Sequence, residues 1–250
     1  MKRFMTITKI ESILFMRNFF CFFFTFVFPV ICLLFYGSIF GNTPSSDLGG
    51  LGMMDVSVPA FSGLIIGMTG LMAFPLTISH YKENKVYKRF DATPIGKGFI
   101  LAVQAFVNFY MALAGFILLF LVGIIVYHIN VQGDFLIILI ALILSIISIF
   151  SLGFFITAIA PNEKISQLLS YLAYFVMIAL SGSTIPKEMF PDSLNVISKC
   201  FPLTYVVDIL QKTFQGVAIK QYANDIIILV ITTAVFIGIG AFLYRRKNWE

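Results

Sequence analysis

Six apolar runs, each long enough to cross a bilayer, dominate this 250-residue chain. A transmembrane helix needs about 20 consecutive, mostly apolar residues. The runs are apolar on every face, so they predict helices rather than the alternating strands of a membrane barrel. Hydrophobic residues make up 59% of the chain and charged residues only 12%, which excludes an ordinary soluble domain. We therefore expect one all-α membrane domain over residues 1–250, with six transmembrane helices at Phe19–Phe40, Val58–Ser79, Phe99–Tyr127, Phe135–Ala160, Gln167–Ile185 and Asp225–Tyr244.

The basic residues lie mostly on one side of the predicted membrane. Alternating the loops between the two sides places 13 of the 17 lysines and arginines together and leaves only Lys187, Lys199, Lys212 and Lys220 opposite. Cytoplasmic loops carry the excess of Lys and Arg, so both termini should be cytoplasmic in a multi-pass protein of the cell membrane. The net charge of +5 follows from this topology and indicates anionic lipid, not nucleic acid, as its partner.

The segment before the first run, residues 1–17, predicts a helix. Phe4, Ile7, Ile10 and Leu14 recur at near-helical spacing, while the basic residues lie mostly elsewhere. This pattern favours a helix lying in the inner membrane interface. The alternative is a cytoplasmic extension of the first transmembrane helix.

The chain lacks the residues that membrane enzymes and ion-coupled transporters use. No Asp, Glu, Lys, Arg or His falls within the expected spans apart from boundary residues such as Asp225, and the three cysteines show no metal-binding spacing. There is no phosphate-binding loop of the Gly-x-x-x-x-Gly-Lys-Ser/Thr type, no paired carboxylates and no Ser/His/Asp set. We expect no catalytic residue, metal or cofactor in this chain. A secondary transporter and an intramembrane enzyme remain as alternatives to a transporter that a separate protein drives.

A dense island of charge, residues 80–98, separates the second and third runs. A short helix over Tyr81–Phe90 would combine charged and apolar side chains, as a protein interface requires. Thr93 and Pro94 should cap and begin the next helix. The residues that we expect to contact a soluble partner are Glu83, Lys85, Val86, Tyr87, Lys88, Arg89 and Phe90. A solvated basic loop is the alternative.

A second irregular segment, residues 181–222, precedes the last run. Pro186, Pro191 and Pro202 divide it into pieces too short to cross the membrane. Short helices at Pro191–Lys199 and Leu203–Phe214 should dip into the outer leaflet as a re-entrant pair. An amphipathic outer loop is the alternative.

Both segments resemble those of ABC-2 type transporter permeases. The stretch from Glu83 to Pro94 is similar to that family's cytoplasmic loop, which commonly runs Glu, Lys, Gly, Thr, an apolar residue, Lys, Arg, Leu, a variable residue, Ala, Thr, Pro. Lys85 and Val86 stand here in place of the usual Gly and Thr. The stretch from Ser181 to Asp208 is similar to the family's segment after its fifth span.

The resemblance implies a permease subunit of an ATP-driven exporter, in which residues 80–98 form the coupling loop to an ABC ATPase. ATP and Mg²⁺ would be used by that ATPase, and a second permease copy or a paralogue would complete the pathway. The family's first, second and fifth spans line this pathway. The resemblance therefore implies a path for a drug, antibiotic, peptide or lipid beside the aromatic residues Phe22, Phe26, Tyr171, Tyr174 and Phe175. Lipid-facing phenylalanine is the alternative for these rings.

Two smaller patterns concern packing. Gly63, Gly67 and Gly70 form a small-residue stripe that favours close approach of another helix of the same chain. Gln104 and Asn108 lie one turn apart in the third run, where interhelical hydrogen bonding is a better interpretation than substrate contact.

Overall fold

The computed structural model describes residues 2–45, 50–91, 96–184, 187 and 190–246. The regular elements of this part of the chain are all helical, without strands, and six of its helices are long and apolar enough to span a membrane. The prediction of an all-α membrane protein is confirmed. The helical elements are α1 (Lys2–Arg17), α2 (Phe19–Phe22), η1 (Phe23–Val27), α3 (Phe28–Phe40), α4 (Met53–Gly67), η3 (Met68–Ala73), α5 (Phe74–Glu83), α6 (Val86–Asp91), α7 (Lys97–Tyr127), α8 (Phe135–Ile159), α9 (Glu163–Leu180), α10 (Asp192–Ser198), α11 (Pro202–Phe214), η5 (Ile219–Gln221) and α12 (Ala223–Arg246).

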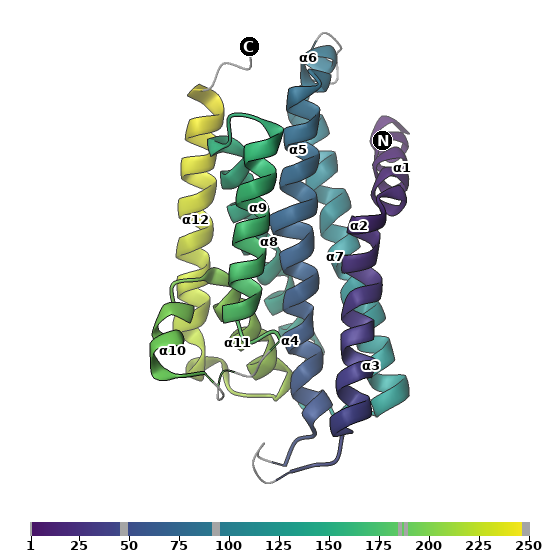
Figure 1. Ribbon diagram of the computed structural model, residues 1–250, viewed down its shortest axis with the longest axis vertical. Helices are drawn as coiled ribbons and strands as arrows, with labels where there is room; N and C mark the ends of the chain where they lie inside the picture. The colour runs from purple at the N-terminus through teal and green to yellow at the C-terminus, as the bar shows by residue number, and fades with distance from the viewer. Residues whose placement is uncertain (1, 46–49, 92–95, 185–186, 188–189, 247–250) are drawn as a thin grey trace.

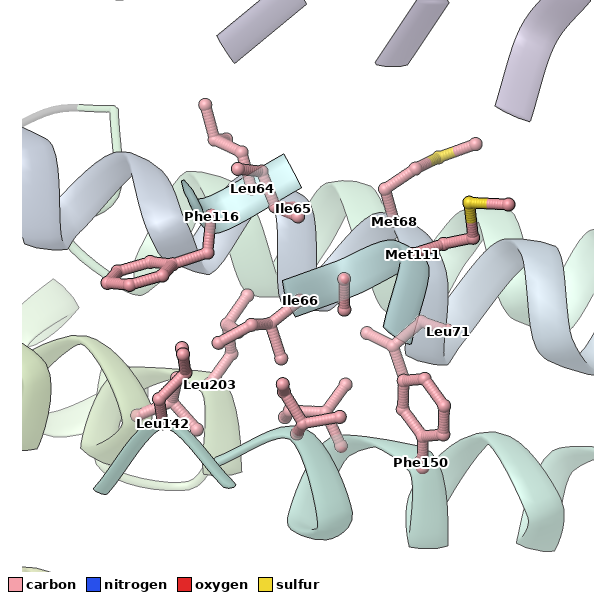
Figure 2. Packing of buried hydrophobic residues seen from close by; sticks show 14 of the residues in the cluster. Leu64, Ile65, Ile66, Met68, Leu71, Met111, Phe116, Leu142, Phe150 and Leu203 are labelled. Carbon is pink, nitrogen blue, oxygen red and sulfur yellow. The ribbon is translucent and has the colours of Figure 1, made fainter. Parts of the chain in front are cut away.

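The second span, built from α4, η3 and α5, occupies the centre of the bundle. In its most apolar stretch 89% of the residues are buried, against 11% in α12 at the periphery. Figure 2 shows how side chains of this span meet those of α7, α8 and α11. The labelled core residues are Leu64, Ile65, Ile66, Met68, Leu71, Met111, Phe116, Leu142, Phe150 and Leu203.

The bundle has two distinct ends. Figure 1 shows α1, α6 and the last turns of α12 at one end, which we call the α6 end, and α10 and α11 at the other, the α10 end. The two terminal helices therefore lie at the same end as the charged island. This arrangement agrees with both termini lying on one side of the membrane, while the identity of that side stays a prediction.

The first and second spans each contain a π-helical segment just before a proline. In η1 and η3 the backbone bonds reach back five residues, as from Phe28 N–H to the Phe23 carbonyl and from Phe74 N–H to the Thr69 carbonyl. The residue directly after each of these donors, Pro29 or Pro75, has no N–H to donate. The prolines thus leave carbonyl groups of both segments without their usual helical donors, and the two π segments contact each other.

The glycine stripe of the second span mediates packing within the chain, as predicted. A Cβ atom on Gly63 would lie 2.5 Å from Ser183 Oγ, and one on Gly67 would lie 3.2 Å from the ring of Tyr174. On the neighbouring α8, a Cβ on Gly153 would lie 2.0 Å from the carbonyl oxygen of Gly70. Glycine therefore sets the close approach of three different elements to this span.

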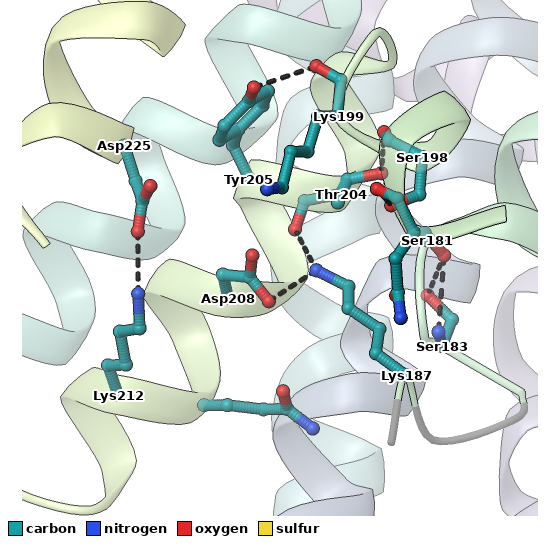
Figure 3. Close-up of polar contacts among 12 residues, drawn as sticks. Ser181, Ser183, Lys187, Ser198, Lys199, Thr204, Tyr205, Asp208, Lys212 and Asp225 are labelled. Carbon is teal, nitrogen blue, oxygen red and sulfur yellow. Dashed lines mark hydrogen bonds and ion pairs between the residues drawn. The ribbon is translucent and has the colours of Figure 1, made fainter. Parts of the chain in front are cut away.

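The predicted pair of short helices before the last span is confirmed as α10 and α11, which meet at 97°. Figure 3 shows two ion pairs that fix α11 in place: Lys187 Nζ lies 2.5 Å from Asp208 Oδ1, and Lys212 Nζ lies 2.7 Å from Asp225 Oδ2. Two of the four lysines predicted on the outer side are thus paired with acids. This pairing reduces the net positive charge of the α10 end.

Several boundaries differ from the prediction because polar residues are accommodated at helix ends. The second span begins at Met53 rather than Val58, since the buried Asp55 carboxylate in its first turn accepts hydrogen bonds from Gly52 N and Asn130 N at 2.8 and 2.9 Å. The fifth span runs from Glu163 to Leu180 rather than from Gln167 to Ile185, because Asn162 caps its first turn.

The N-terminal segment is helical, as predicted, and packs along the beginning of α7. Phe4 contacts the rings of Phe99 and Phe106, and the hydroxyls of Ser12 and Tyr110 are hydrogen-bonded. Its position in a membrane interface stays a prediction. Of the expected apolar stripe, Phe4 and Ile7 pack against the core, whereas Ile10 and Leu14 are exposed.

Candidate coupling site

The charged island folds as a continuation of the second span followed by a separate short helix. The expected single helix over Tyr81–Phe90 is wrong, because α5 ends at Glu83 and α6 begins at Val86. Lys85 between them has φ of 55°, a left-handed conformation that glycine adopts most easily. The break falls where the resembling family commonly has glycine. The expected cap at Thr93 and Pro94 lies outside the described residues, and α7 begins at Lys97.

The short helix α6 has an inner and an outer face. Tyr87 is buried, with 2% of its surface exposed, and its hydroxyl donates to Gln104 Oε1 of α7 at 2.6 Å. Lys85, Lys88 and Arg89 are exposed at the α6 end of the bundle. Val86 and Phe90 are half-buried. The basic residues are therefore available to a soluble partner, whereas Tyr87 attaches the helix to the bundle.

Glu83 holds the second and fifth spans together. Its Oε2 accepts a hydrogen bond from the backbone N–H of Glu163, at 2.7 Å, in the first turn of α9. A carboxylate is favourable there because the first N–H groups of a helix lack internal partners and carry partial positive charge. His80 Nδ1, one turn earlier, lies 3.1 Å from Glu163 Oε2. Sequence inspection did not reveal this role, since the two segments are separated by 80 residues.

The interpretation of Gln104 as an interhelical hydrogen-bonding residue is confirmed by its bond with Tyr87. Asn108 differs, because its Nδ2 donates to the backbone carbonyl of Gln104 within the same helix, at 2.9 Å.

A buried acid beside α6 was missed in the sequence. Glu11 of α1 is 7% exposed, and its Oε1 accepts a hydrogen bond from the Tyr81 hydroxyl at 2.9 Å. Burial raises the pKa of Glu11 above its ordinary value, while hydrogen bonding from Tyr81 and Gln104 opposes this shift. Glu11 is the only acid of α1 and falls on the buried stripe formed with Phe4, Ile7 and Phe15. This place on the apolar stripe was the feature of the sequence that could have indicated that Glu11 is buried.

The aromatic residues proposed for a substrate path do not gather into one lining. Phe22 and Phe26 contact each other along the first span with tilted rings whose centroids are 5.6 Å apart, and both are half-buried. Tyr174 is buried against Gly67, whereas Phe175 is 56% exposed. The first and fifth spans meet instead through Phe20 and the half-buried Tyr171, with centroids 6.2 Å apart. Sequence inspection did not single out Phe20.

Comparison with known proteins agrees with this architecture. The family described as ABC-2 type transporter matches residues 2–214 of the chain. The chain belongs to this family. Its matched region includes α1, the charged island around α6, and the bent pair of α10 and α11. It is accordingly a multi-pass membrane protein of the permease type, that is, a transmembrane subunit of an ABC transporter.

The chain is also similar to Nodulation protein J of Rhizobium leguminosarum bv. viciae, with 29% identity over 97 residues. The alignment covers 39% of this chain and 38% of Nodulation protein J, so the match spans well under half of that relative's length.

Proposed function

We propose that this chain is the membrane half of an ATP-driven exporter of the cell membrane, with both termini in the cytoplasm. A separate ABC ATPase binds ATP and Mg²⁺ and contacts α6. Two permease chains, identical or paralogous, enclose the pathway between them. Its cargo is a hydrophobic or amphipathic molecule such as a drug, antibiotic, peptide or lipid, moved outward.

The observation that carries this proposal is the construction of α6. Two basic side chains, Lys88 and Arg89, are exposed on a helix of six residues, a third, Lys85, is exposed just before it, and the helix is fixed to the bundle through Tyr87. A partner that binds Lys85, Lys88 and Arg89 would therefore contact a part of the protein that is attached to both neighbouring spans. Family membership supports an ATPase as this partner.

The choice of cargo and of a second permease rests on the first and fifth spans. Their meeting point at Phe20 and Tyr171 is aromatic and uncharged, which suits an amphipathic molecule. Large apolar side chains on both spans, among them Phe35, Leu172 and Phe175, are more than half exposed. A second copy of the chain would cover them, as in the two-fold pairs that most oligomers form.

The orientation is supported by charge. The predicted topology assigns 13 of the 17 basic residues to the side that carries α6, and two lysines of the α10 end are paired with Asp208 and Asp225. The ATPase would then act at the cytoplasmic end, where ATP binding changes the side to which the pathway opens.

The test is a charge reversal confined to α6. Lys88→Glu combined with Arg89→Glu should weaken copurification with the partner ABC ATPase by about tenfold or more, because like charges placed across an interface cost several kcal/mol. Glu83 is left intact because it caps α9. Stimulation of ATP hydrolysis by the permease should fall in parallel.

The matched control reverses two exposed lysines at the α10 end, Lys199→Glu and Lys220→Glu. This control should bind the ATPase normally. Wild-type association of the Lys88/Arg89 variant, at normal abundance in the membrane, would show that α6 is only a solvated basic segment.

A further inference from the structure

A buried polar cluster connects four elements at the α6 end. Its members are Glu11 of α1, Tyr81 of α5, Tyr87 of α6 and Gln104 of α7, which we call the anchor cluster. The Tyr81 hydroxyl donates to Glu11 at 2.9 Å, and the Tyr87 hydroxyl donates to Gln104 at 2.6 Å. The rings of Tyr81 and Tyr87 have centroids 5.9 Å apart and join the two bonds into one group.

Such a cluster is costly to bury unless its groups are hydrogen-bonded. Glu11, Tyr87 and Gln104 are 7%, 2% and 1% exposed. A buried donor or acceptor that loses its partner keeps the full cost of its removal from water. The polar bonds therefore favour one geometry of the four elements and disfavour displaced ones, which apolar contacts alone would do less strictly.

The helix α6 depends on this cluster for its position. It has only six residues, fewer than an isolated helix needs to be stable in water, and it follows a left-handed residue, Lys85. Its other neighbours are reached through the half-buried Val86 and Phe90. The bond from Tyr87 to Gln104 is a directional contact that helps to fix α6 against α7.

We infer that Tyr87 and Glu11 are positioning residues that hold α6 at a fixed place on the second and third spans, so that a force applied to α6 moves these spans instead of displacing α6 alone. The effect on ATP-driven transport rests on the proposed function. The fixed position of α6 is a property of the permease itself and does not. Neither residue needs to touch the ATPase. Both act through the exposed Lys88 and Arg89 on the opposite face.

Three substitutions separate the hydrogen bonds from the packing. Tyr87→Phe removes only the hydroxyl group and leaves Gln104 Oε1 without its donor. Glu11→Ala removes the acceptor of Tyr81. Glu11→Gln keeps an acceptor oxygen and has the neutral charge that burial favours at this position. Tyr205→Phe is the matched control, because its hydroxyl donates to the Lys199 carbonyl at the α10 end.

The first measurement needs no ATPase. In a chain whose three cysteines are replaced, spin labels at the exposed positions Lys88 and Lys164 report the distance between α6 and the start of α9. Wild type, Glu11→Gln and Tyr205→Phe should give one narrow distance distribution. Tyr87→Phe and Glu11→Ala should give a broad one, because loss of a buried hydrogen bond shifts the balance toward a displaced α6 by roughly fivefold to a hundredfold.

The second measurement uses the complex with the ATPase. Tyr87→Phe and Glu11→Ala should retain ATPase association, since Lys88 and Arg89 remain, but lose most of the stimulated hydrolysis, and Glu11→Gln should restore it. A narrow distribution in Tyr87→Phe would overturn the inference. If Glu11→Ala does not fold, the comparison of Tyr87→Phe with Tyr205→Phe still decides. If the wild type does not bind the ATPase, the proposed function fails, while the label distances still test the position of α6.

Discussion

Gly153→Ala should destabilise the bundle, although it exchanges only one hydrogen for one methyl group. Gly153 lies on α8 where this helix crosses the π segment η3 of the second span. A Cβ atom at this position would lie 2.0 Å from the carbonyl oxygen of Gly70 and 3.1 Å from Pro75 Cγ, whereas ordinary contacts are 3.4–4 Å. The nearest atom belongs to the backbone and cannot rotate away.

The size of the effect follows from this overlap. The two helices must separate by roughly 1 Å or more, which opens gaps along a close-packed interface. Overpacking of this kind costs about 1–3 kcal/mol. Alanine also favours the helix over glycine by up to about 1 kcal/mol, which partly opposes the clash. For a chain of this size, the clash by itself should lower the thermal midpoint by on the order of 2–12 °C, measured relative to a Gly→Ala change without a clash.

The assay is thermal unfolding of the purified permease in one detergent, followed by the fraction that remains monodisperse. Gly238→Ala on α12 is the control, because a Cβ there meets nothing within 4 Å and retains only the gain in helix preference. The difference between the two variants isolates the clash. Equal midpoints for Gly153→Ala and Gly238→Ala would refute the close crossing of α8 and η3.

Two further outcomes test the coupling segment and the orientation. Lys85→Gly should raise the thermal midpoint, because it relieves a left-handed conformation that costs an L residue roughly 1–2 kcal/mol. The control Lys88→Gly, inside α6, should lower the midpoint. A lower midpoint for both variants would contradict the turn at Lys85. The orientation is tested in whole cells with an impermeant thiol reagent and an otherwise cysteine-free chain. The charge asymmetry predicts that the reagent labels Asp47→Cys but not Lys247→Cys. The opposite pattern would show that the chain has the inverted orientation.

The transmembrane architecture was readable from the sequence because it depends on local properties. The length and apolarity of a run determine whether it can cross a bilayer, and proline limits the length of a helix wherever it occurs. The six spans and the pair α10 and α11 therefore appear close to their predicted places. The charged island containing Lys88 and Arg89 was also visible without a fold, since it stands between two apolar runs, and both side chains are exposed. Their contact with an ATPase stays a prediction.

The tertiary structure decided which residues meet. Glu83 belongs to the charged island by sequence, but its partner is the start of α9, 80 residues away. Tyr87 lies inside and Lys88 outside because the break at Lys85 sets the rotation of α6. Glu11 is buried only because α1 packs against the second and third spans. Hydropathy follows from the neighbours along the chain, whereas these contacts depend on helices that are distant in sequence and adjacent in the bundle.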